Sequence, residues 1–202
     1  GVEVQKSPRP VTNGNMSFSA VNVRTLRMQS QGFGTRLRTS GGAHGTLTGH
    51  ASHGGHSGQL DYLVGAGSRR SDGHRDNADG QTESYYGRVG YRLANGWDAS
   101  ALFLKTDGWA HDPLPVGSDP TPVTSRYDTD SEFYLGQLTW RRDRSEAWLK
   151  AYLDDGYADW RQWDAASKPP EQENGIFDYA NYGARARASF SPRGRTQLLV
   201  GL

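Results

Sequence analysis

Apolar and polar residues alternate with a period of two along most of the chain, and helical periodicity is nearly absent. Successive side chains of a β-strand point to opposite faces of a sheet, so this pattern predicts an all-β fold. The predicted strands cover residues 33–42, 45–54, 59–70, 82–93, 97–107, 128–142, 146–155, 177–190 and 196–202. Several of these segments are about ten residues long, close to the ~9–11 residues with which a tilted strand crosses a bilayer.

Short and long connections alternate between the predicted strands. The short ones are expected at residues 54–58, 94–96, 142–145 and 192–194, and the long polar ones around 71–81, 108–127 and 156–176. Asn95-Gly96 is the preferred dipeptide of a type I′ hairpin turn. In an antiparallel up-and-down meander every second connection lies at the same end, so the short turns gather at one end and the long loops at the other. Only the short connection at 41–45 departs from this rule. The asymmetry is typical of outer-membrane β-barrels.

The two faces of the predicted strands differ in chemistry. In the segment 177–190, alanines and single aromatic residues alternate with Arg185 and Arg187, and in the segment 146–155 alanines and leucines oppose Lys150. A lipid-facing wall needs apolar side chains, whereas a wide lumen that holds water or a polar plug accepts charged ones. Interfacial aromatic residues are expected beside the short turns, at Trp97, Trp140 and Trp148.

The charged face also predicts that the sheet stays open. Eight strands can close a small barrel, but its narrow interior would bury many arginines, and an unpaired buried charge is costly. These arginines are Arg36, Arg38, Arg88, Arg92, Arg185 and Arg187. Residues 33–202 are therefore expected to form a curved sheet whose first and last strands do not pair.

A soluble β-sandwich shows the same alternation, with the apolar face turned inward against a second sheet. Alternation alone does not separate the two architectures. The loop asymmetry, the strand length, the alanines on the apolar face and the aromatic residues near the turns together favour the membrane barrel.

Composition changes this interpretation little. The net charge of +1 gives no reason to expect a nucleic-acid partner, and the absence of cysteine excludes disulfides and thiolate metal sites. Only 34% of the 202 residues are hydrophobic, which is little for a soluble core of this size. The chain begins and ends within alternating segments and shows no signal peptide, so it is expected to be a fragment of a longer protein.

The first 25 residues carry a resemblance to a known family. The stretch VEVQKSPRPVTNGNMSFSAVNVRT resembles the end of the plug domain of TonB-dependent outer-membrane receptors. The matching positions are Val2, Glu3, Val4, Pro8, Gly14, Asn22, Val23 and Thr25. Ser7 stands where the family usually has glycine, and Asn13 replaces the usual aromatic residue. The stretches GFGTRLRTSGG and GRVGYRLANGWD are similar to the family's first barrel strands.

The resemblance implies two parts and a function. Residues 1–27 would be the C-terminal end of the plug domain with its linker, and residues 28–202 the first eight to nine strands of a large barrel. Such receptors sit in the outer-membrane lipid of Gram-negative cells and import a scarce nutrient, such as a siderophore or another metal chelate. They are driven by the TonB complex, which would act through an N-terminal segment that this chain lacks.

Two other functions remain open. A passive porin-like or small structural outer-membrane barrel would share the strand pattern but has no use for a plug-like N-terminus. A soluble carbohydrate-binding sandwich would turn its apolar strand faces toward each other.

Metal ligands and catalytic groups form only weak patterns. His44 and His50 share a strand face and are weak candidates for a metal site, since His53 is expected on the other face and His56 in a turn. A row of carboxylates at Asp128, Asp130 and Glu132 suits calcium or, more simply, a solvated strand extension. No nucleophile or phosphate-binding motif is present, so neither an enzyme nor a cofactor is expected.

Aromatic side chains in the long loops are the best candidates for ligand contact. Exposed aromatic residues on loops often mark binding surfaces, although they also pack loops together or form an outer girdle. The candidates are Trp109, His111, Trp160 and Trp163.

Overall fold

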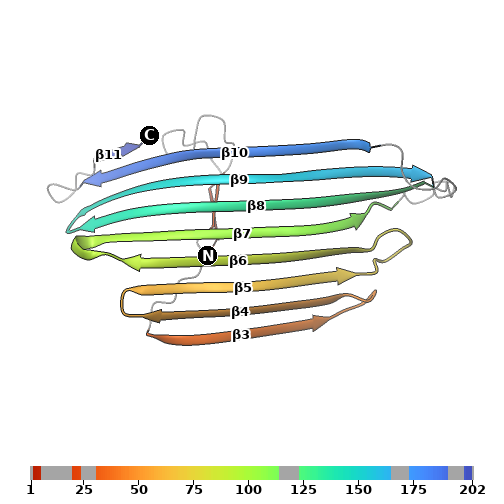
Figure 1. Ribbon diagram of the computed structural model, residues 1–202, viewed down its shortest axis with the longest axis horizontal. Coiled ribbons are helices and arrows are strands. Elements are labelled where there is room, and N and C mark those ends of the chain that lie inside the picture. The colour runs from red at the N-terminus through yellow and green to blue at the C-terminus, as the bar shows by residue number, and fades with distance from the viewer. Residues whose placement is uncertain are drawn as a thin grey trace.

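The computed structural model is built almost entirely of antiparallel strands (Figure 1). It describes residues 2–5, 20–23, 31–113, 123–164, 173–190 and 198–201, with side chains over 31–113, 125–161 and 175–190. The strands are β1 (Val2–Gln5), β2 (Ala20–Val23), β3 (Gly32–Gly41), β4 (Leu47–Ser57), β5 (Leu60–Ser71), β6 (Gly80–Arg92), β7 (Trp97–His111), β8 (Val123–Arg142), β9 (Ser145–Asp164), β10 (Glu173–Phe190) and β11 (Leu198–Gly201).

The main sheet is the predicted up-and-down meander. Its nine strands run in the order β11-β10-β9-β8-β7-β6-β5-β4-β3, and each strand pairs antiparallel with the next along the chain. Figure 1 places the β4–β5, β6–β7 and β8–β9 turns at one end and the other described connections at the opposite end. The predicted separation of connections is therefore confirmed for the described part of the chain, while the turn at 192–194 lies outside it.

Several strands are longer than the sequence pattern predicts. Both ends of the segments expected as long loops, 108–127 and 156–176, continue β7, β8, β9 and β10 beyond the alternating apolar residues. The prediction was wrong because the extensions have polar side chains on the face that is apolar nearer the short turns. Backbone pairing between neighbouring strands continues across them, as between Asp128 and Asp159.

The turn between β6 and β7 has the predicted type I′ geometry. Asn95 has φ 59° and ψ 31°, Gly96 has φ 83°, and the Trp97 amide donates to the carbonyl of Ala94. A Cβ at Gly96 would overlap the carbonyl oxygen of Arg141. This turn therefore needs glycine both for its positive φ and for the close approach of the neighbouring turn.

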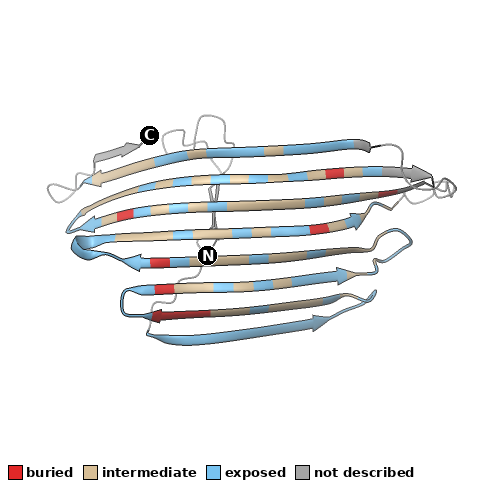
Figure 2. Cartoon of the chain, in the orientation of Figure 1, coloured by how far each residue is buried: buried red, intermediate tan, exposed pale blue. Residues whose placement is uncertain are grey.

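The main sheet stays open at both edges, as expected. Its strand order ends at β3 and at β11, with no pairing between them among the described strands. Buried residues are few and lie toward the strand ends (Figure 2), and no hydrophobic residue with a described side chain is buried. The described residues include no helix long and apolar enough to span a membrane.

The N-terminal segment contributes a separate two-stranded hairpin. Strands β1 and β2 pair antiparallel, with Val2 opposite Val23 and Glu3 opposite Asn22. Val4 completes the described part of the plug-like motif, whereas Pro8, Gly14 and Thr25 lie outside the described residues. The division of the chain at residues 27 and 28 stays a prediction.

Substitution of Gly96 by alanine should destabilise the fold more than a change at either of two matched glycines. Gly58 shares a positive φ of 60°, but a Cβ at this position would have nothing within 4 Å, and Gly34 has neither constraint. We expect Gly34→Ala to be near neutral, Gly58→Ala to cost about 1 kcal/mol of unfolding free energy, and Gly96→Ala to cost clearly more. Urea titration of the protein measures the three values, and equal losses for Gly58→Ala and Gly96→Ala would contradict the steric argument.

Candidate functional site

One face of the main sheet carries a continuous apolar band. Direct cross-strand partners point to the same face, so the register from β3 to β10 assigns every side chain to a face. Two adjacent rows show the band well: Tyr62, Val89, Ala101, Gly136, Ala151 and Ala184 form one, and Val64, Gly87, Phe103, Tyr134, Leu153 and Tyr182 form the next. Many of its large members remain exposed, Tyr182 by 82% and Leu149 by 50%. We call this surface the apolar band.

Aromatic residues border the apolar band beside the short turns. Trp97 and Trp140 are cross-strand partners with ring centroids 6.5 Å apart, and Tyr91 lies on the same face three residues before the β6–β7 turn begins at Ala94. The third predicted girdle residue, Trp148, is on the opposite face, where the Lys150 ammonium lies 4.9 Å from its ring centroid. Its assignment to the girdle was wrong. Trp148 pairs with Thr139, whereas the neighbouring residue Ala147 pairs with Trp140, and adjacent residues of a strand point to opposite faces.

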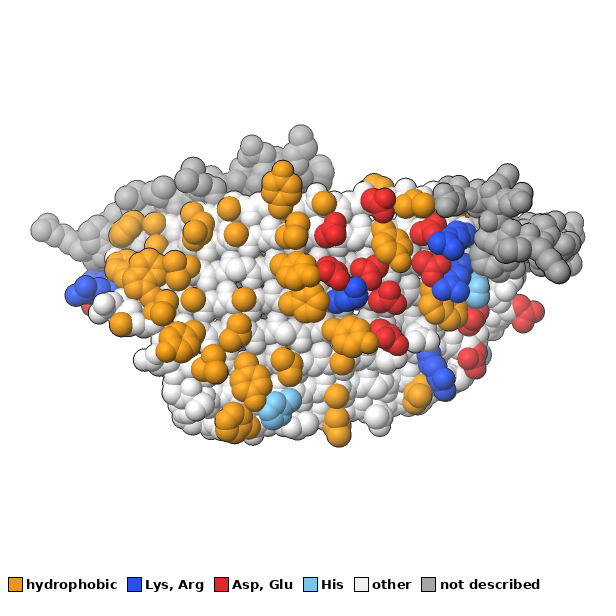
Figure 3. All heavy atoms as spheres, in the orientation of Figure 1, with side chains coloured by type: hydrophobic (Ala, Val, Ile, Leu, Met, Phe, Trp, Pro, Cys, Tyr) orange, Lys and Arg blue, Asp and Glu red, His pale blue; other side chains and the backbone are white. Residues whose placement is uncertain are grey.

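Charged residues replace the apolar band abruptly on the same face of the extended strands. This border, which we call the collar, consists of residues on the face of the apolar band: Glu83, Lys105, Asp107, Asp130, Glu132 and Asp155. Figure 3 shows the change, with hydrophobic side chains over the part of the sheet nearer the short turns and charged side chains toward the other end. Along β7, eight residues separate Trp97 from Lys105, or about 27 Å of strand. A tilt near 40° reduces this to about 20 Å, comparable with the ~25 Å apolar height of outer-membrane barrels.

Tyrosines join the apolar band to the collar. The Tyr134 hydroxyl donates to Glu132 at 2.7 Å, and the Tyr85 hydroxyl donates to Glu83 at 2.9 Å. Each ring therefore lies over the band while its hydroxyl reaches the charged border, which is the orientation of interfacial tyrosine in membrane proteins. The hydrogen bond to Glu83 raises the pKa of Tyr85, which lies in the collar row opposite Lys105.

Lys105 is the cation at the centre of the collar. Its ammonium lies 2.7 Å from Glu132 and 3.1 Å from Asp130. Hydrogen bonding to Glu132 and then to Asp130 raises the pKa of Lys105, and hydrogen bonding to Lys105 and then to Tyr134 lowers the pKa of Glu132. The predicted carboxylate row on β8 is thus neutralised in part by lysine.

The opposite face carries the charges that the sequence predicts for a lumen. Arg88 donates to the carboxylate of Asp61, whose side chain is buried with an exposure of 3%, while the Arg88 side chain is 11% exposed. Gly90 makes room for this pair, because a Cβ there would press against Asp61 and the Arg88 guanidinium. Removing one partner of a buried ion pair leaves an uncompensated charge, so this pair is structurally important.

Tyrosines lie over glycines on this charged face. The Tyr86 ring covers Gly65 and the Tyr152 ring covers Gly183, and a Cβ on either glycine would collide with the ring above it. Tyr86 also stacks on His50, with ring centroids 5.9 Å apart. The glycines therefore allow large rings to lie flat along the sheet.

The histidines with described side chains do not form a metal site. His50 is bound to the Tyr86 hydroxyl at 3.2 Å, and His44 lies in the β3–β4 turn with φ 56°. His56 was expected in a turn but lies within β4, because the β4–β5 turn is tighter than predicted and occupies only residues 58 and 59. Among the residues with described side chains, no group of three or more His, Asp or Glu could hold a metal ion.

His53 is a polar residue within the apolar band. Its Nδ1 lies 2.9 Å from the Thr35 hydroxyl, and its Nε2 lies 2.8 Å from the Tyr62 hydroxyl. Both ring nitrogens are thus paired along three neighbouring strands. This pairing satisfies both ring nitrogens of an imidazole that lies on a largely apolar surface.

Two of the predicted ligand-contact residues lie together on the face of the apolar band, beyond the collar. The ring centroids of Trp109 and His111 are 5.3 Å apart, and the Arg126 guanidinium lies 4.6 Å from the Trp109 ring centroid. His111 Nδ1 is 2.8 Å from the Asp79 carboxylate. Both residues are at the end of β7, where they hold neighbouring strands together, and neither is in the loop that the sequence predicts.

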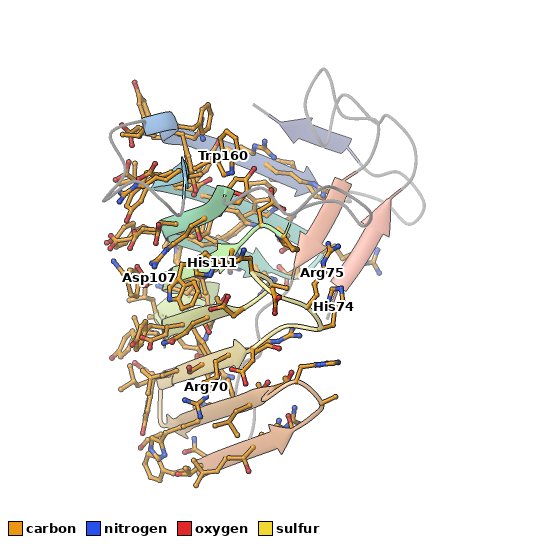
Figure 4. The ribbon with its side chains drawn as sticks, turned by 90° about the vertical axis from the view of Figure 1, so that its right-hand side faces the viewer. Arg70, His74, Arg75, Asp107, His111 and Trp160 are labelled. Atoms are coloured by element: carbon orange, nitrogen blue, oxygen red, sulfur yellow. The ribbon has the colours of Figure 1, made fainter. Side chains whose placement is uncertain are left out.

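The other two predicted contact residues are in β9. Trp160 is on the charged face opposite Tyr127, with ring centroids 6.2 Å apart, and its indole nitrogen is buried without a hydrogen-bond partner among the described residues. Figure 4 shows Trp160 apart from His111 at the end of the sheet far from the short turns. Trp163 pairs with Thr124, but its side chain lies outside the described residues. The four candidates thus do not form one site.

Sequence reasoning identified Asp130 and Glu132 but missed the rest of the collar, and it also missed the aromatic residues Phe177 and Tyr179. Phe177 is 66% exposed, and its ring centroid lies 6.1 Å from that of Tyr179 on the charged face. The sequence did contain a signal for these longer strands, because aromatic and polar residues continue to alternate through segments predicted as loops. Comparison with protein-family models, curated proteins and solved structures finds no match for this chain.

Breaking the buried ion pair should be costly. We expect Arg88→Ala to lower the unfolding free energy by about 3–5 kcal/mol, because Asp61 is left charged and buried. Arg92→Ala is the matched control, since Arg92 is exposed on the same strand and face. The Asp61→Asn and Arg88→Gln double variant should recover part of the loss, and urea titration of the full-length protein measures all three. A loss no larger than that of Arg92→Ala would contradict the assignment.

Removal of the Lys105 ammonium should raise the pKa of Glu132 toward its ordinary value of 4.5. Because the folded-state pKa of Glu132 is lowered, the ion pair stabilises the fold above pH 4.5, and this contribution is lost as pH falls through the folded-state value. Because the pKa of Lys105 is raised, the contribution is complete below pH 10.5. Carboxyl-carbon NMR titration of Lys105→Met measures the shift. Lys150→Met, on the opposite face, should leave the pKa of Glu132 unchanged.

Proposed function

We propose that this chain is part of the wall of an outer-membrane β-barrel receptor that imports a scarce nutrient with energy from the TonB complex. The observation that carries the membrane part is the apolar band, bounded by Trp97 and Trp140 at one edge and by the tyrosines of the collar at the other. The opposite face carries a buried ion pair. Apolar outside and polar inside is the arrangement of membrane barrels.

Backbone pairing supports the same proposal. Hydrocarbon offers no hydrogen bonds, so a membrane-spanning strand must pair with neighbours on both sides. Strands β4 to β10 have such neighbours, and the unpaired edge of β3 would be completed by strands of a longer chain. In a soluble sandwich the band would instead be buried by a second sheet, and the only other described sheet is the short hairpin of β1 and β2.

The receptor part of the proposal rests on the N-terminal hairpin. The residues that resemble the receptor plug, including Val2, Glu3 and Asn22, form paired strands rather than an extended tail. In Figure 4 this hairpin lies on the side of the sheet opposite the labelled Asp107, which points outward on the face of the apolar band. A folded element on the lumen side suits a plugged receptor. A passive porin-like barrel would not need it.

The lumen face of the extended strands is the better candidate for ligand contact. Tyr127, Trp160 and Phe177 present aromatic surface there, and the Trp160 indole offers a buried donor without a partner among the described residues. Trp109 and His111 point the other way in a barrel of this orientation, toward the surroundings. The nutrient would be a chelate or similar compound with ring or apolar surface and an oxygen acceptor.

A charge placed on the apolar band should impair insertion, whereas a charge on the other face should not. We expect Ala184→Arg to destabilise the inserted protein by about 2–4 kcal/mol, the cost of Arg near the midplane of a bilayer. Asn181→Arg is the control, because Asn181 is exposed on the opposite face of the same strand. Heat-modifiability on gels and urea titration in vesicles measure folding. Equal tolerance of both charges would contradict the membrane assignment.

Uptake tests the receptor function in the full-length protein. Cells that depend on it for a nutrient chosen from a panel of siderophores, metal complexes, cobalamin and glycans should lose uptake when TonB is deleted. We expect Trp160→Ala to weaken ligand binding at least several-fold and Trp109→Ala to leave it unchanged. Uptake that persists without TonB would instead support a passive barrel, and a loss of binding in Trp109→Ala alone would reverse the assignment of faces.

A further inference from the structure

Arginines without a counter-ion gather on the charged face of the first strands of the main sheet. The register places Arg36 and Arg38 of β3 and Arg69 of β5 on this face. All three are exposed, and none makes a hydrogen bond or ion pair with a residue whose side chain is described. The strand spacings put the Cα atoms of Arg36 and Arg38 about 7 Å apart and those of Arg38 and Arg69 about 12 Å apart. Their long side chains can therefore reach one group that lies between them.

Small and polar residues form the floor between these arginines. His50 and Gly67 continue the row of Arg38 across β4 and β5, and Ser84 is the next partner on β6. A Cβ at Gly67 would lie 3.1 Å from the Ser84 hydroxyl and 3.5 Å from the His50 ring. Glycine therefore leaves space between two polar side chains. The set that we call the arginine cluster consists of Arg36, Arg38, His50, Gly67, Arg69 and Ser84.

One side of the arginine cluster is held in place by Tyr86. The Tyr86 ring stacks on the His50 ring, and its hydroxyl lies 3.2 Å from His50 Nε2. The Ser84 hydroxyl makes no hydrogen bond with any residue whose side chain is described. The floor thus combines a fixed wall with a hydroxyl donor that is available to a ligand.

The strands around the arginine cluster do not supply balancing negative charge. Asp61 is the only carboxylate that β3 to β6 place on the charged face, and Arg88 already binds it. The residues that precede β3 do not correct the imbalance, because positions 1–31 contain one acidic and four basic residues. These are Glu3 against Lys6, Arg9, Arg24 and Arg27.

The connection between β5 and β6 adds charge of both signs near the strand ends. Figure 4 shows its Arg75 on the side of the sheet opposite Asp107, which is the side of the charged face. Of its carboxylates, Asp72 lies beside Gly45 in the β3–β4 turn, and Asp79 pairs with a histidine at the end of β7. Neither of these two forms an ion pair with the arginine cluster.

We propose that the arginine cluster binds an oxyanion, namely the carboxylate or phosphate groups of a small molecule with at least two negative charges. Guanidinium groups bind such oxygens through paired N–H donors, and these charge-assisted hydrogen bonds are strong. Three neighbouring arginines without a counter-ion repel one another, so an oxyanion between them also relieves this repulsion.

The proposed site is separate from the aromatic surface at Trp160. Arg38 is on β3, whereas Trp160 is on β9, six strands away in the sheet. Binding of an oxyanion does not depend on the membrane location proposed above. In the proposed receptor the arginine cluster would favour nutrients that carry acidic groups, and this consequence alone rests on the proposed function.

Isothermal titration calorimetry of the purified full-length protein tests the proposal. The two probes are pyrophosphate and tricarballylate, which distinguish a phosphate from a carboxylate preference, and the uncharged triamide of tricarballylate is the control ligand. We expect saturable binding of at least one oxyanion, weaker at high salt because ions screen the attraction. The triamide should not bind.

Charge variants locate the site. Arg38→Gln and Arg69→Gln should each weaken binding at least about ten-fold, as expected for the loss of a hydrogen bond to a charged group. Arg38→Lys keeps the charge but loses the paired donors, so it should weaken binding less than Arg38→Gln. Arg70→Gln is the matched control, since Arg70 is the exposed neighbour of Arg69 on the opposite face.

A shape variant separates a built site from a diffuse positive surface. Gly67→Val keeps every charge but fills the floor, and it should also weaken binding. Gly34→Val is the control, because Gly34 is on the same face outside the arginine cluster and its Cβ would have nothing within 4 Å. Thermal unfolding checks that each variant is folded, and the arginine variants decide the proposal if Gly67→Val is not.

Several outcomes would overturn the inference. These are binding of the triamide as strong as that of the oxyanions, or an equal loss of binding in Arg69→Gln and Arg70→Gln. A protein that binds neither oxyanion, and in which Arg38→Gln lowers the unfolding free energy, would show that another segment of a longer chain occupies the arginine cluster. Uptake that depends on TonB without any oxyanion binding would refute this inference alone. Oxyanion binding in a protein without such uptake would refute only the proposed function.

Discussion

Every surface of this molecule depends on the continuous antiparallel ladder that joins β3 to β10. The ladder satisfies the backbone polar groups of seven strands on both sides without any contribution from a hydrophobic core, and no hydrophobic residue with a described side chain is buried. A soluble domain of this size depends on apolar burial for most of its stability. Here many large apolar side chains stay exposed on one face of the ladder, so the described sheet itself supplies little apolar burial.

The ladder also sets a strict limit on side-chain volume. Strands lie about 4.8 Å apart, so a ring that lies flat along the sheet needs a small neighbour. On the charged face Tyr86 covers Gly65, and Tyr152 covers Gly183. On the apolar face large and small residues are also neighbours, but here the small residues lie in one row across the strands. Ala101, Gly136 and Ala151 follow one another across three strands, and the larger residues of the next row leave a groove above them. The positions of glycine and alanine thus shape both faces.

Much of this arrangement could be predicted from the sequence. Period-two alternation assigned faces correctly wherever one face is apolar, as for Tyr85 and Val89 against Tyr86 and Arg88. The Asn95-Gly96 turn could be predicted because its positive φ values demand those residues. The strand ends were not predicted, because polar residues such as Asp128 and Asp159 stand there on the face that is apolar elsewhere, although aromatic and polar residues continue to alternate. Sites that depend on partners distant in sequence, such as Asp61 with Arg88, were also out of reach.

The extension of the strands beyond the apolar band changes where recognition is expected. A ligand site built on loops is adaptable but imprecise, whereas a site built on paired strands is held in place by its neighbours. Trp160 and Tyr127 are cross-strand partners, so their rings are positioned by the ladder rather than by a loop. The same extension holds Lys105 between two carboxylates on the other face. The same strand extension therefore provides a rigid aromatic surface on the charged face of the sheet and a rigid charged border on the face of the apolar band. Because adjacent residues of each strand serve opposite faces, as Asp154 and Asp155 do, single substitutions can test the two surfaces separately.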